Sequence, residues 1–196
     1  MGISERVLVA MARVPRERFV PEEARGHAYV DTPLSLGYGQ TISAPSMVGI
    51  MCSVLDVRDG QKVLEVGGGW GYHAAVMSLL AGPGRVYTVE RIPELADRAR
   101  ALLKELGYDN VVVVTGDGST GLPEFAPYDR ISVAAAAPRV PEPLVAELAD
   151  HGRMVVPVGQ YIQELILVEK DDGRVRTTPK GGVAFVPLVG RAGFKE

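Results

Sequence analysis

The sequence predicts an α/β fold with a doubly wound, mostly parallel sheet, helices on both faces and an antiparallel C-terminal ending. Strand-like and helix-like segments alternate from residue 62 to residue 158, which is typical of parallel strands joined by helices. A glycine-rich turn directly follows the first buried strand, within residues 62–72. Asp172-Gly173 lies between two strand-like segments and is a strong hairpin signal, so we expect the sheet to end antiparallel.

The N-terminal part of the chain has a different pattern. Residues 3–14 predict an amphipathic helix that ends before Pro15. Residues 15–45 are dense in proline, glycine and polar residues, so we expect a long structured loop region that carries function. A helix over about residues 45–55 should then lead into the first strand of the sheet.

The remaining elements follow from apolar periodicity. Strands are expected at residues 85–90, 110–114, 129–134 and 153–158, and helices at residues 93–106 and 141–149. Residues 165–170 and 174–178 should form the hairpin, and residues 183–189 should form a further apolar strand.

Length and composition limit the possible classes of protein. We expect one domain over residues 1–196, with N-terminal helices and a substrate loop region in 1–60 and a cofactor-binding core in 61–196. The net charge of −3, without a lysine- or arginine-rich run, disfavours a nucleic-acid binder. The sequence shows neither a long apolar span nor a signal peptide, so we expect a cytoplasmic protein with no membrane contact.

The glycine turn predicts a nucleotide-type ligand on a Rossmann-like sheet. Gly69, Gly71 and Ala74 fit the dinucleotide pattern, and Gly67 extends the turn so that bare backbone N–H groups could meet a ligand. Glu90, about 20 residues on, fits the acid that binds a ribose. The pattern alone is weak, because NAD and S-adenosylmethionine carry the same adenosine.

Acidic residues at the strand ends separate these two ligands. Glu65 and Asp117 join Glu90 at the ends of successive strands, where they would favour a cationic sulfonium and repel a pyrophosphate. Taken alone, Glu65 could tether a loop and Asp117 could be a turn residue. Because all three acids fall on the ligand side of the sheet, we predict S-adenosylmethionine rather than NAD.

The histidines offer little catalytic machinery. His27, His73 and His151 are isolated in the sequence, without a histidine–carboxylate or cysteine cluster at metal spacing, so we expect surface or loop histidines and no metal site. Transfer to a carboxylate needs no base, because that acceptor is already ionised at neutral pH. The sequence therefore permits a carboxyl methyltransferase without demanding one.

Several blocks then resemble the protein-L-isoaspartate O-methyltransferase family, in its order. The most specific is Gln40-Thr-Ile-Ser-Ala-Pro45, ahead of the glycine turn. Other matching blocks begin at residues 18, 28, 63, 116, 126, 135 and 185. Three positions depart from the family's usual residues, namely Trp70, Ala134 and Ala184. Of these, we expect Trp70 to pack over the helix, the alternative being that it narrows the cofactor pocket.

The resemblance implies a repair enzyme that methylates the α-carboxylate of L-isoaspartyl residues in damaged proteins. It implies that Ser43 orients the acceptor carboxylate, although Ser43 could instead cap the following helix. The implied cofactor residues are Thr41, Ile42, Ser43, Glu65, Val66, Gly67, Gly68, Gly69, Gly71, Glu90, Arg91, Asp117 and Gly118, and the implied peptide-binding residues are Ser43, Val186, Pro187 and Leu188.

Two other classes stay open at this point. One is an NAD-dependent oxidoreductase, and the other is a non-catalytic relative that binds the cofactor and damaged proteins without turnover. We expect the chain to act as a monomer.

Overall fold

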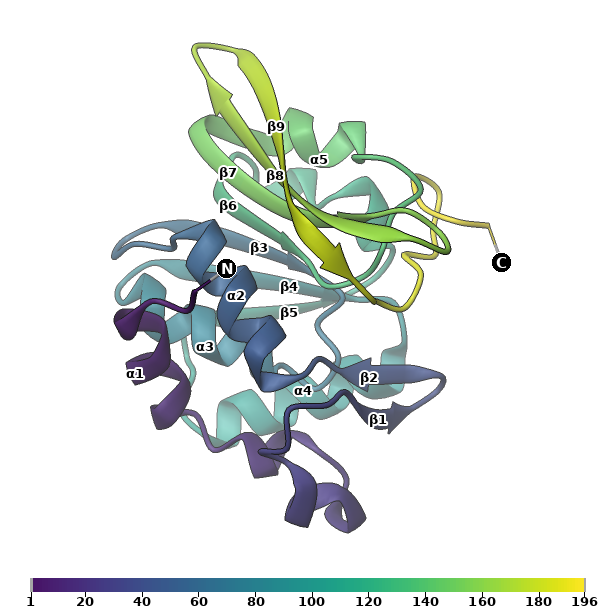
Figure 1. The fold of residues 1–196 in the computed structure, drawn as a ribbon. Coiled ribbons are helices and arrows are strands. Elements are labelled where there is room, and N and C mark those ends of the chain that lie inside the picture. Colours follow the sequence, from purple (N-terminus) through teal and green to yellow (C-terminus); the bar gives the residue numbers. More distant parts are fainter. Residues whose placement is uncertain (1, 196) are drawn as a thin grey trace.

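A seven-stranded sheet forms the centre of the protein in the computed structural model, which describes residues 2–195 (Figure 1). The strand order is β5-β4-β3-β6-β7-β8-β9, with parallel pairing from β5 to β7 and antiparallel pairing of β8 and β9. The strands are β3 Lys62–Val66, β4 Arg85–Glu90, β5 Val111–Thr115, β6 Tyr128–Val133, β7 Leu148–Val158, β8 Gln163–Asp171 and β9 Arg174–Val183. The predicted fold class is confirmed.

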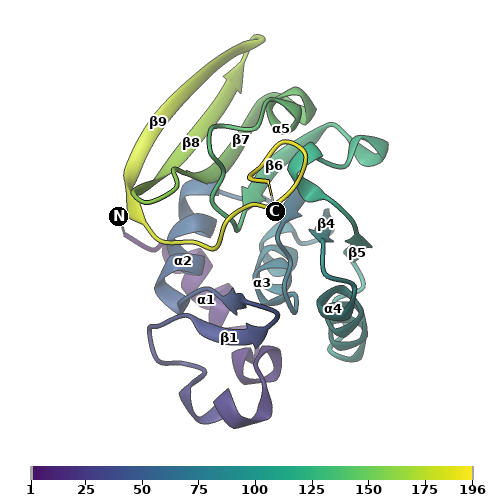
Figure 2. The same cartoon turned by 90° about the vertical axis from the view of Figure 1, so that its right-hand side faces the viewer.

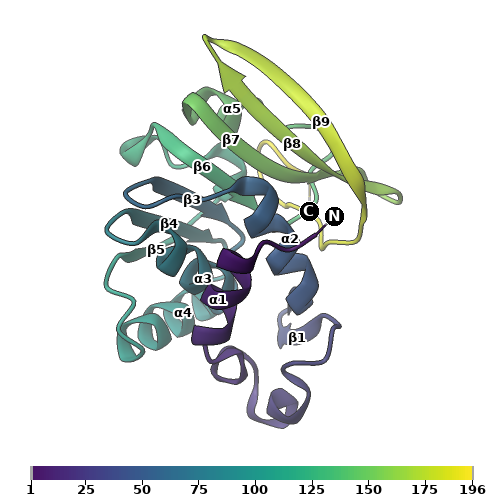
Figure 3. The same cartoon turned by 60° about the vertical axis from the view of Figure 1, so that its left-hand side comes forward.

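Helices cover both faces of this sheet. One face carries α1 Glu5–Arg13, α2 Pro45–Leu55, α3 Tyr72–Ala81 and α4 Pro93–Glu105, which Figure 3 shows in front of the strands. The other face carries α5 Glu142–Glu147 and the short 3-10 helices η3 Gly118–Thr120 and η4 Pro123–Phe125. Neighbouring residues of β3 point to opposite faces, with Val63 in one core cluster and Leu64 in the other.

The segment before α2 contains more regular structure than its composition indicates. The 3-10 helices η1 Arg16–Phe19 and η2 Glu22–His27 precede a hairpin of β1 Leu34–Gly37 and β2 Gln40–Ile42. The hairpin turns at Tyr38 and Gly39, which both have positive φ, of 55° and 70°. Such a turn matches the twist of the flanking strands. The two strands are too short for their apolar alternation to predict the hairpin from the sequence.

The C-terminal hairpin is confirmed, although β9 continues to Val183, and the strand predicted over residues 153–158 already begins at Leu148. Asp172 and Gly173 have φ of 47° and 72°, as a two-residue hairpin turn requires. The helix predicted over residues 141–149 ends at Glu147, because the chain already pairs with β6 at Leu148.

The strand predicted over residues 183–189 is wrong beyond Val183, where β9 ends. The following segment leaves the sheet edge and crosses the carboxyl ends of the parallel strands, where Figure 2 shows it in yellow. There Ala136 N–H donates to Val186 O at 2.8 Å, and Leu188 N–H donates to Ala136 O at 2.7 Å. These bonds tie the segment to the chain just after β6 instead of to a neighbouring strand. Within residues 2–195, no helix is both long and apolar enough to span a membrane.

Candidate active site

The site lies where the direction of the strand order reverses, between β3 and β6. The chain runs from β3 outward to β4 and β5, and then returns to β6 on the other side of β3. Ligands of open α/β sheets bind beyond the carboxyl ends of the strands at such a point. Figure 2 looks onto these ends, with the β1–β2 hairpin and the C-terminal segment beside them.

Three adjoining cavities open at this edge, and we name each by one lining residue. The Glu65 cavity is lined in part by Thr41, Ile42, Ser43, Glu65, Gly68 and His73. The Glu90 cavity is lined in part by Val66, Gly69, Glu90, Arg91, Gly118 and Leu188. The Phe185 cavity is lined in part by Ser43, Ser46, Met47, Ala184, Phe185 and Val186.

Thr41 and Ala134 line all three cavities, so these residues mark the place where the cavities meet. Ser43 stands between the Glu65 cavity and the Phe185 cavity. Pro187 and Leu188, predicted to contact peptide, line the Glu90 cavity, whereas Val186 reaches both the Glu90 and the Phe185 cavity.

The turn after β3 needs glycine for reasons of space and backbone conformation. Gly67, Gly69 and Gly71 have φ of 91°, 54° and 93°, a region that other residues rarely adopt. A Cβ on Gly68 would lie 2.3 Å from Thr88 Oγ1, and one on Gly71 would lie 2.8 Å from a methyl carbon of Leu103. Gly71 therefore shapes the turn against α4, without lining any of the three cavities.

The expectation of bare N–H groups in this turn is wrong. Gly67 and Gly68 donate to Val89 O at 2.9 and 3.3 Å, and Gly71 donates to Gly68 O. Gly69 N–H donates to Glu90 Oε2 at 2.9 Å. Because these four N–H groups are already bonded within the protein, they do not form the kind of cradle that holds a pyrophosphate.

Glu90 occupies the place predicted for the acid that binds a ribose. It ends β4, is 5% exposed and lines the Glu90 cavity. Its Oε1 accepts the Ile92 N–H at 2.9 Å, while its Oε2 accepts the Gly69 N–H. The two bonds hold the carboxylate at the cavity wall and link it to the glycine turn.

Glu65 and His73 form a buried pair in the wall of the Glu65 cavity. Glu65 Oε2 accepts a 2.6 Å hydrogen bond from Thr88 Oγ1, and Glu65 Oε1 lies 3.6 Å from His73 Nδ1. Glu65 Oε1 and His73 Nε2 have no hydrogen-bond partner among the described residues. The prediction of a surface or loop position is wrong for His73, which is buried in α3.

Burial moves the pKa values of this pair in opposite directions. Burial, with a smaller contribution from the Glu90 charge, raises the pKa of Glu65 to about 8 although the Thr88 bond acts against it. Burial lowers the pKa of His73 to about 4. Near neutral pH the pair is therefore mainly uncharged, and a cation in the cavity would favour ionisation of Glu65.

Asp117 is held as a turn residue. Its Oδ1 accepts bonds from Ser119 N–H at 2.9 Å and Ser119 Oγ at 2.6 Å, and its Oδ2 accepts the Arg191 N–H at 2.9 Å. Although burial acts to raise the pKa of Asp117, the bonds from Arg191 and Ser119 lower it overall. The structure brings Gly118 into the Glu90 cavity, whereas Asp117 lines an adjoining surface hollow with Arg191.

The helix-cap alternative for Ser43 is wrong. The N-cap of α2 is Ala44, which provides no side-chain bond, and the Ser46 N–H donates to Asp31 Oδ1 at 2.9 Å instead. Ser43 is held through its backbone, because its carbonyl accepts a 2.7 Å bond from Arg16 Nη2. No site role was predicted for Arg16, which the sequence does not distinguish from a surface arginine, or for Asp31, which ends the family-like block beginning at Ala28.

Trp70 packs against α4 and also lines a cavity, so both predicted positions are found together. Its ring lies under the Arg98 guanidinium of α4, 5.0 Å from the guanidinium carbon to the ring centroid. The ring lines the Glu65 cavity, and its Nε1 is buried without a partner among the described residues. It is the single tryptophan of the chain, so its fluorescence reports on this cavity alone.

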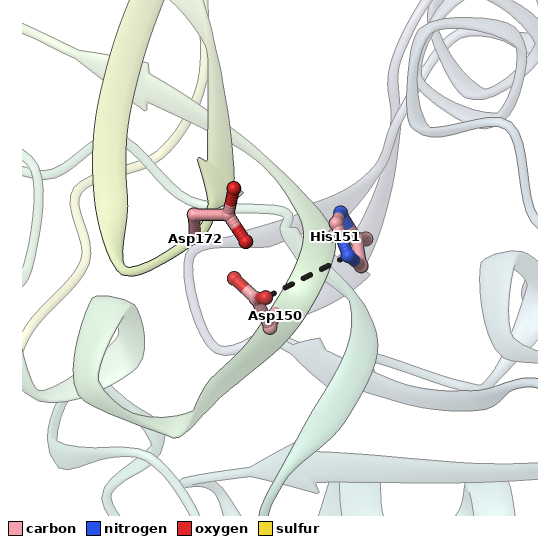
Figure 4. A group of neighbouring side chains, drawn as sticks. All are labelled: Asp150, His151 and Asp172. Carbon is pink, nitrogen blue, oxygen red and sulfur yellow. Dashed lines mark ion pairs between the residues drawn. The ribbon is translucent and has the colours of Figure 1, made fainter.

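A separate acidic group lies at the opposite end of the sheet. Asp150, His151 and Asp172 are exposed, and one ligand atom from each lies within 4.8 Å of the others (Figure 4). His151 Nδ1 is also 2.6 Å from Asp171 Oδ1. The prediction that no histidine–carboxylate cluster exists is wrong here, because strand pairing brings the turn of β8–β9 beside the start of β7. None of these three residues lines any of the three cavities.

Comparison with known proteins then decides the family. A family model described as protein-L-isoaspartate(D-aspartate) O-methyltransferase matches residues 1–193. The chain belongs to this family. It is 68% identical to the protein-L-isoaspartate O-methyltransferase of Methanocella arvoryzae over 186 residues, covering 94% of this chain and 99% of the relative. It is 59% identical to protein-L-isoaspartate O-methyltransferase 2 of Archaeoglobus fulgidus, covering 100% of this chain and 90% of the relative.

Solved structures of the isoaspartate methyltransferase family share the fold. One superposes with a TM-score of 0.89 at 34% identity over 98% of this chain, which spans 63% of that chain's length. Another, from Plasmodium falciparum and in complex with S-adenosyl-L-homocysteine, has a TM-score of 0.86 at 27% identity, covering 95% of this chain and 91% of that one. The prediction of S-adenosylmethionine over NAD is confirmed.

Proposed function

We propose that this protein transfers a methyl group from S-adenosylmethionine to the α-carboxylate of L-isoaspartyl residues in damaged proteins and peptides. The observation that carries the proposal is the position of Ser43, between the Glu65 cavity and the Phe185 cavity. A cofactor beside the glycine turn and a peptide carboxylate in the Phe185 cavity would both come within reach of this residue. Family membership supports the same activity.

The residues around the glycine turn suit a cationic cofactor. The buried Glu65 Oε1 lacks a partner among the described residues, and the N–H groups of the turn are already bonded. Glu65 and His73 would face the amino-acid end of the cofactor, and Glu90 would accept bonds from the ribose hydroxyls. The remaining proposed cofactor residues are Thr41, Ile42, Ser43, Val66, Gly67, Gly68, Gly69, Gly71, Arg91 and Gly118, with Asp117 acting by holding the adjacent C-terminal segment.

The chemistry needs orientation more than proton transfer. When bound, the cofactor supplies an electrophilic methyl group on a sulfonium. An acceptor carboxylate oxygen forms the new C–O bond while the methyl–sulfur bond breaks, and that bonding pair stays on the sulfur, so no proton moves. Ser43 would donate a hydrogen bond to the other carboxylate oxygen and fix its direction, and Val186, Pro187 and Leu188 would frame the peptide.

Methyl transfer from labelled S-adenosylmethionine to an isoaspartyl peptide tests the proposal. We expect incorporation into the isoaspartyl peptide and none into the matched aspartyl peptide. Tight binding of S-adenosylhomocysteine without any transfer would show instead a non-catalytic relative. Binding of NAD in place of S-adenosylhomocysteine would show an oxidoreductase.

We further propose that the protein acts as a cytoplasmic monomer, with residues 1–196 forming one domain made of a substrate region (1–60) and a cofactor-binding core (61–196). Supporting this, buried residues of α1 and α2 share one core cluster with residues of β3 and α3. Sedimentation equilibrium should give a mass near 21.0 kDa. A single cooperative unfolding transition should accompany it, whereas separate transitions for the two regions would contradict the single domain.

A further inference from the structure

We infer that Arg16 and Asp31 are positioning residues of the acceptor site, which hold the two ends of the short segment from Ser43 to Ser46. The inference rests on the proposed role of Ser43. It goes beyond that role, because neither side chain lines any of the three cavities. Both residues come from the irregular region between α1 and α2, which approaches the site from outside the sheet (Figure 3).

Arg16 holds the first end of the segment. Its side chain is fully buried, its Nη2 donates to Ser43 O at 2.7 Å, and its Nε donates to Ala28 O at 2.7 Å. Its guanidinium also lies 4.7 Å from the centroid of the Tyr72 ring, and Tyr72 lines the Glu65 cavity. One side chain thus joins the Ser43 backbone to the first residue of α3.

Stability alone does not explain why this cation is buried. Among the described residues Arg16 forms no ion pair within 4.0 Å, and its Nη1 has no hydrogen-bond partner. Burial lowers the pKa of Arg16, as expected for a cation taken out of water. A buried charge without a carboxylate partner lowers the stability of the fold unless its other contacts compensate for the lost hydration. Two of its contacts lead to the site: the hydrogen bond to the Ser43 carbonyl and the contact with the Tyr72 ring.

Asp31 holds the second end. Its Oδ1 accepts the Ser46 N–H at 2.9 Å, in the first turn of α2, where the N-cap residue Ala44 provides no side-chain bond. This hydrogen bond lowers the pKa of the exposed Asp31 carboxyl. A carboxylate at the start of a helix is also favoured by the helix dipole. The cation at one end and the anion at the other hold the backbone of the segment that carries Ser43.

Such a role predicts a particular kinetic result. A shift of about 1 Å in a group that orients a reacting atom can lower the rate by about 100-fold. Loss of either contact should therefore lower turnover, while the cavities beside the glycine turn keep their shape and their affinity for the cofactor. A residue that only stabilises the fold would lower the melting temperature without changing kcat below that temperature.

The test compares Arg16→Met with Arg130→Met. Arg130 is also a buried arginine bonded to backbone carbonyls, those of Asp56 and Asp129, but it lies at the amino end of β6 and lines none of the three cavities. For Arg16→Met we expect kcat on an isoaspartyl peptide to fall by about 10- to 100-fold. S-adenosylhomocysteine affinity, followed by Trp70 fluorescence, should change less than about twofold. Arg130→Met should lower the melting temperature and leave kcat within about twofold.

Asp31→Ala provides a second test that does not depend on a buried residue, with Asp59→Ala as its control. Asp59 is likewise an exposed carboxylate, paired with Arg6 at 2.8 Å. We expect kcat to fall by about 3- to 10-fold in Asp31→Ala only, the effect of losing one capping bond. Arg16→Lys, which can reach one carbonyl, should recover part of the activity lost in Arg16→Met.

The outcomes separate this inference from the proposed function. A wild-type protein without methyl transfer to the isoaspartyl peptide would contradict the proposed function itself. An active wild type with full kcat in both Arg16→Met and Asp31→Ala would overturn the inference. The inference would also be overturned if Arg16→Met lost cofactor affinity as strongly as turnover. If Arg16→Met does not fold, the comparison of Asp31→Ala with Asp59→Ala decides.

Discussion

At the scale of single residues, Glu65 and His73 show how burial sets protonation in the site. Both side chains are almost completely enclosed, and each carries an atom without a hydrogen-bond partner among the described residues. Because burial disfavours the charged form, the acid keeps its proton and the base remains neutral. The pair can therefore stay uncharged before the cofactor binds and still offer a carboxylate to a cation.

The pH dependence of stability should reveal this pair. The folded state keeps a proton on Glu65 from the ordinary pKa of 4.5 up to about 8, so this residue makes stability fall as pH rises through that window. His73, whose pKa drops from 6.5 to about 4, makes stability rise with pH in its own window. The two effects oppose each other below pH 6.5, and the Glu65 effect alone remains from 6.5 to 8.

Urea unfolding of wild type and Glu65→Gln measures this effect. We expect the free energy of unfolding of the wild type, relative to Glu65→Gln, to fall between pH 6.5 and 8 by at most about 1.4 kcal/mol per pH unit. The exposed Glu164→Gln is the control and should follow the wild type. Parallel curves for wild type and Glu65→Gln would show that Glu65 is ionised throughout.

The Ser43 hydroxyl gives the second prediction at this scale. Ser43→Ala should lower kcat on an isoaspartyl peptide by about 10- to 100-fold, the effect of one lost hydrogen bond to a charged group. S-adenosylhomocysteine affinity should change little. Ser53→Ala, near the other end of α2, is the control. Since the acceptor carboxylate has a reference pKa of roughly 3.5, wild-type kcat should be nearly flat from about pH 6 to 8. Full turnover in Ser43→Ala, with a steep rise in rate through neutral pH, would indicate a missed general base.

At the scale of elements, the turn between β3 and α3 connects the acids of two strands. Gly68 lies against Thr88, which bonds Glu65, and Gly69 donates to Glu90. The turn therefore determines the position of both carboxylates at once. Its glycines are required because the backbone passes close to these side chains, as much as because it contacts a ligand.

A methyl group at Gly68 should disturb this arrangement. Its Cβ would lie 2.3 Å from Thr88 Oγ1, so the Thr88–Glu65 hydrogen bond must shift. We expect Gly68→Ala to lower the free energy of unfolding by about 1 to 3 kcal/mol. The affinity for S-adenosylhomocysteine should fall as well. Gly26→Ala, where a Cβ meets nothing within 4 Å, is the control. Unchanged stability and affinity in Gly68→Ala would show that the backbone of the turn can shift to make room for the methyl group.

At the scale of the whole molecule, the two ends of the chain enclose the carboxyl edge of the sheet. The region before α2 brings Arg16 and Asp31 to Ser43, and the segment after β9 crosses the strand ends toward Asp117. Figure 2 shows both around the ends of the strands. The site is therefore built from parts that lie far from the glycine turn in the sequence.

Asp117 should act by holding the segment after β9 against the strand ends. Asp117→Ala removes the acceptor for Ser119 and Arg191, so we expect the free energy of unfolding to fall by about 1 to 3 kcal/mol. Hydrogen exchange should become faster in residues 188–194, while cofactor affinity changes little. The exposed Asp97→Ala, which loses only a pair with Arg100, is the control. Lost affinity with unchanged stability would show that Asp117 contacts the cofactor directly.

The sequence by itself determined the fold class, most helix and strand positions, the C-terminal hairpin and the family. These depend on local properties: apolar periodicity, turn residues and contiguous motifs. Helix α2 lies at Pro45–Leu55 as predicted, and the residues predicted from the glycine turn and from the block beginning at Gln40 largely gather around the three cavities.

Only the tertiary structure decided which charged residues are buried and what they hold. Arg16 could be a surface arginine until folding places it against Ser43, and His73 could lie on a helix surface until α3 packs beside Glu65. The segment after Val183 is apolar enough for a strand, yet it bonds to Ala136 across the sheet end. These features depend on contacts between residues distant in the chain, and burial, hydrogen bonding and pKa are properties of such contacts rather than of the sequence pattern.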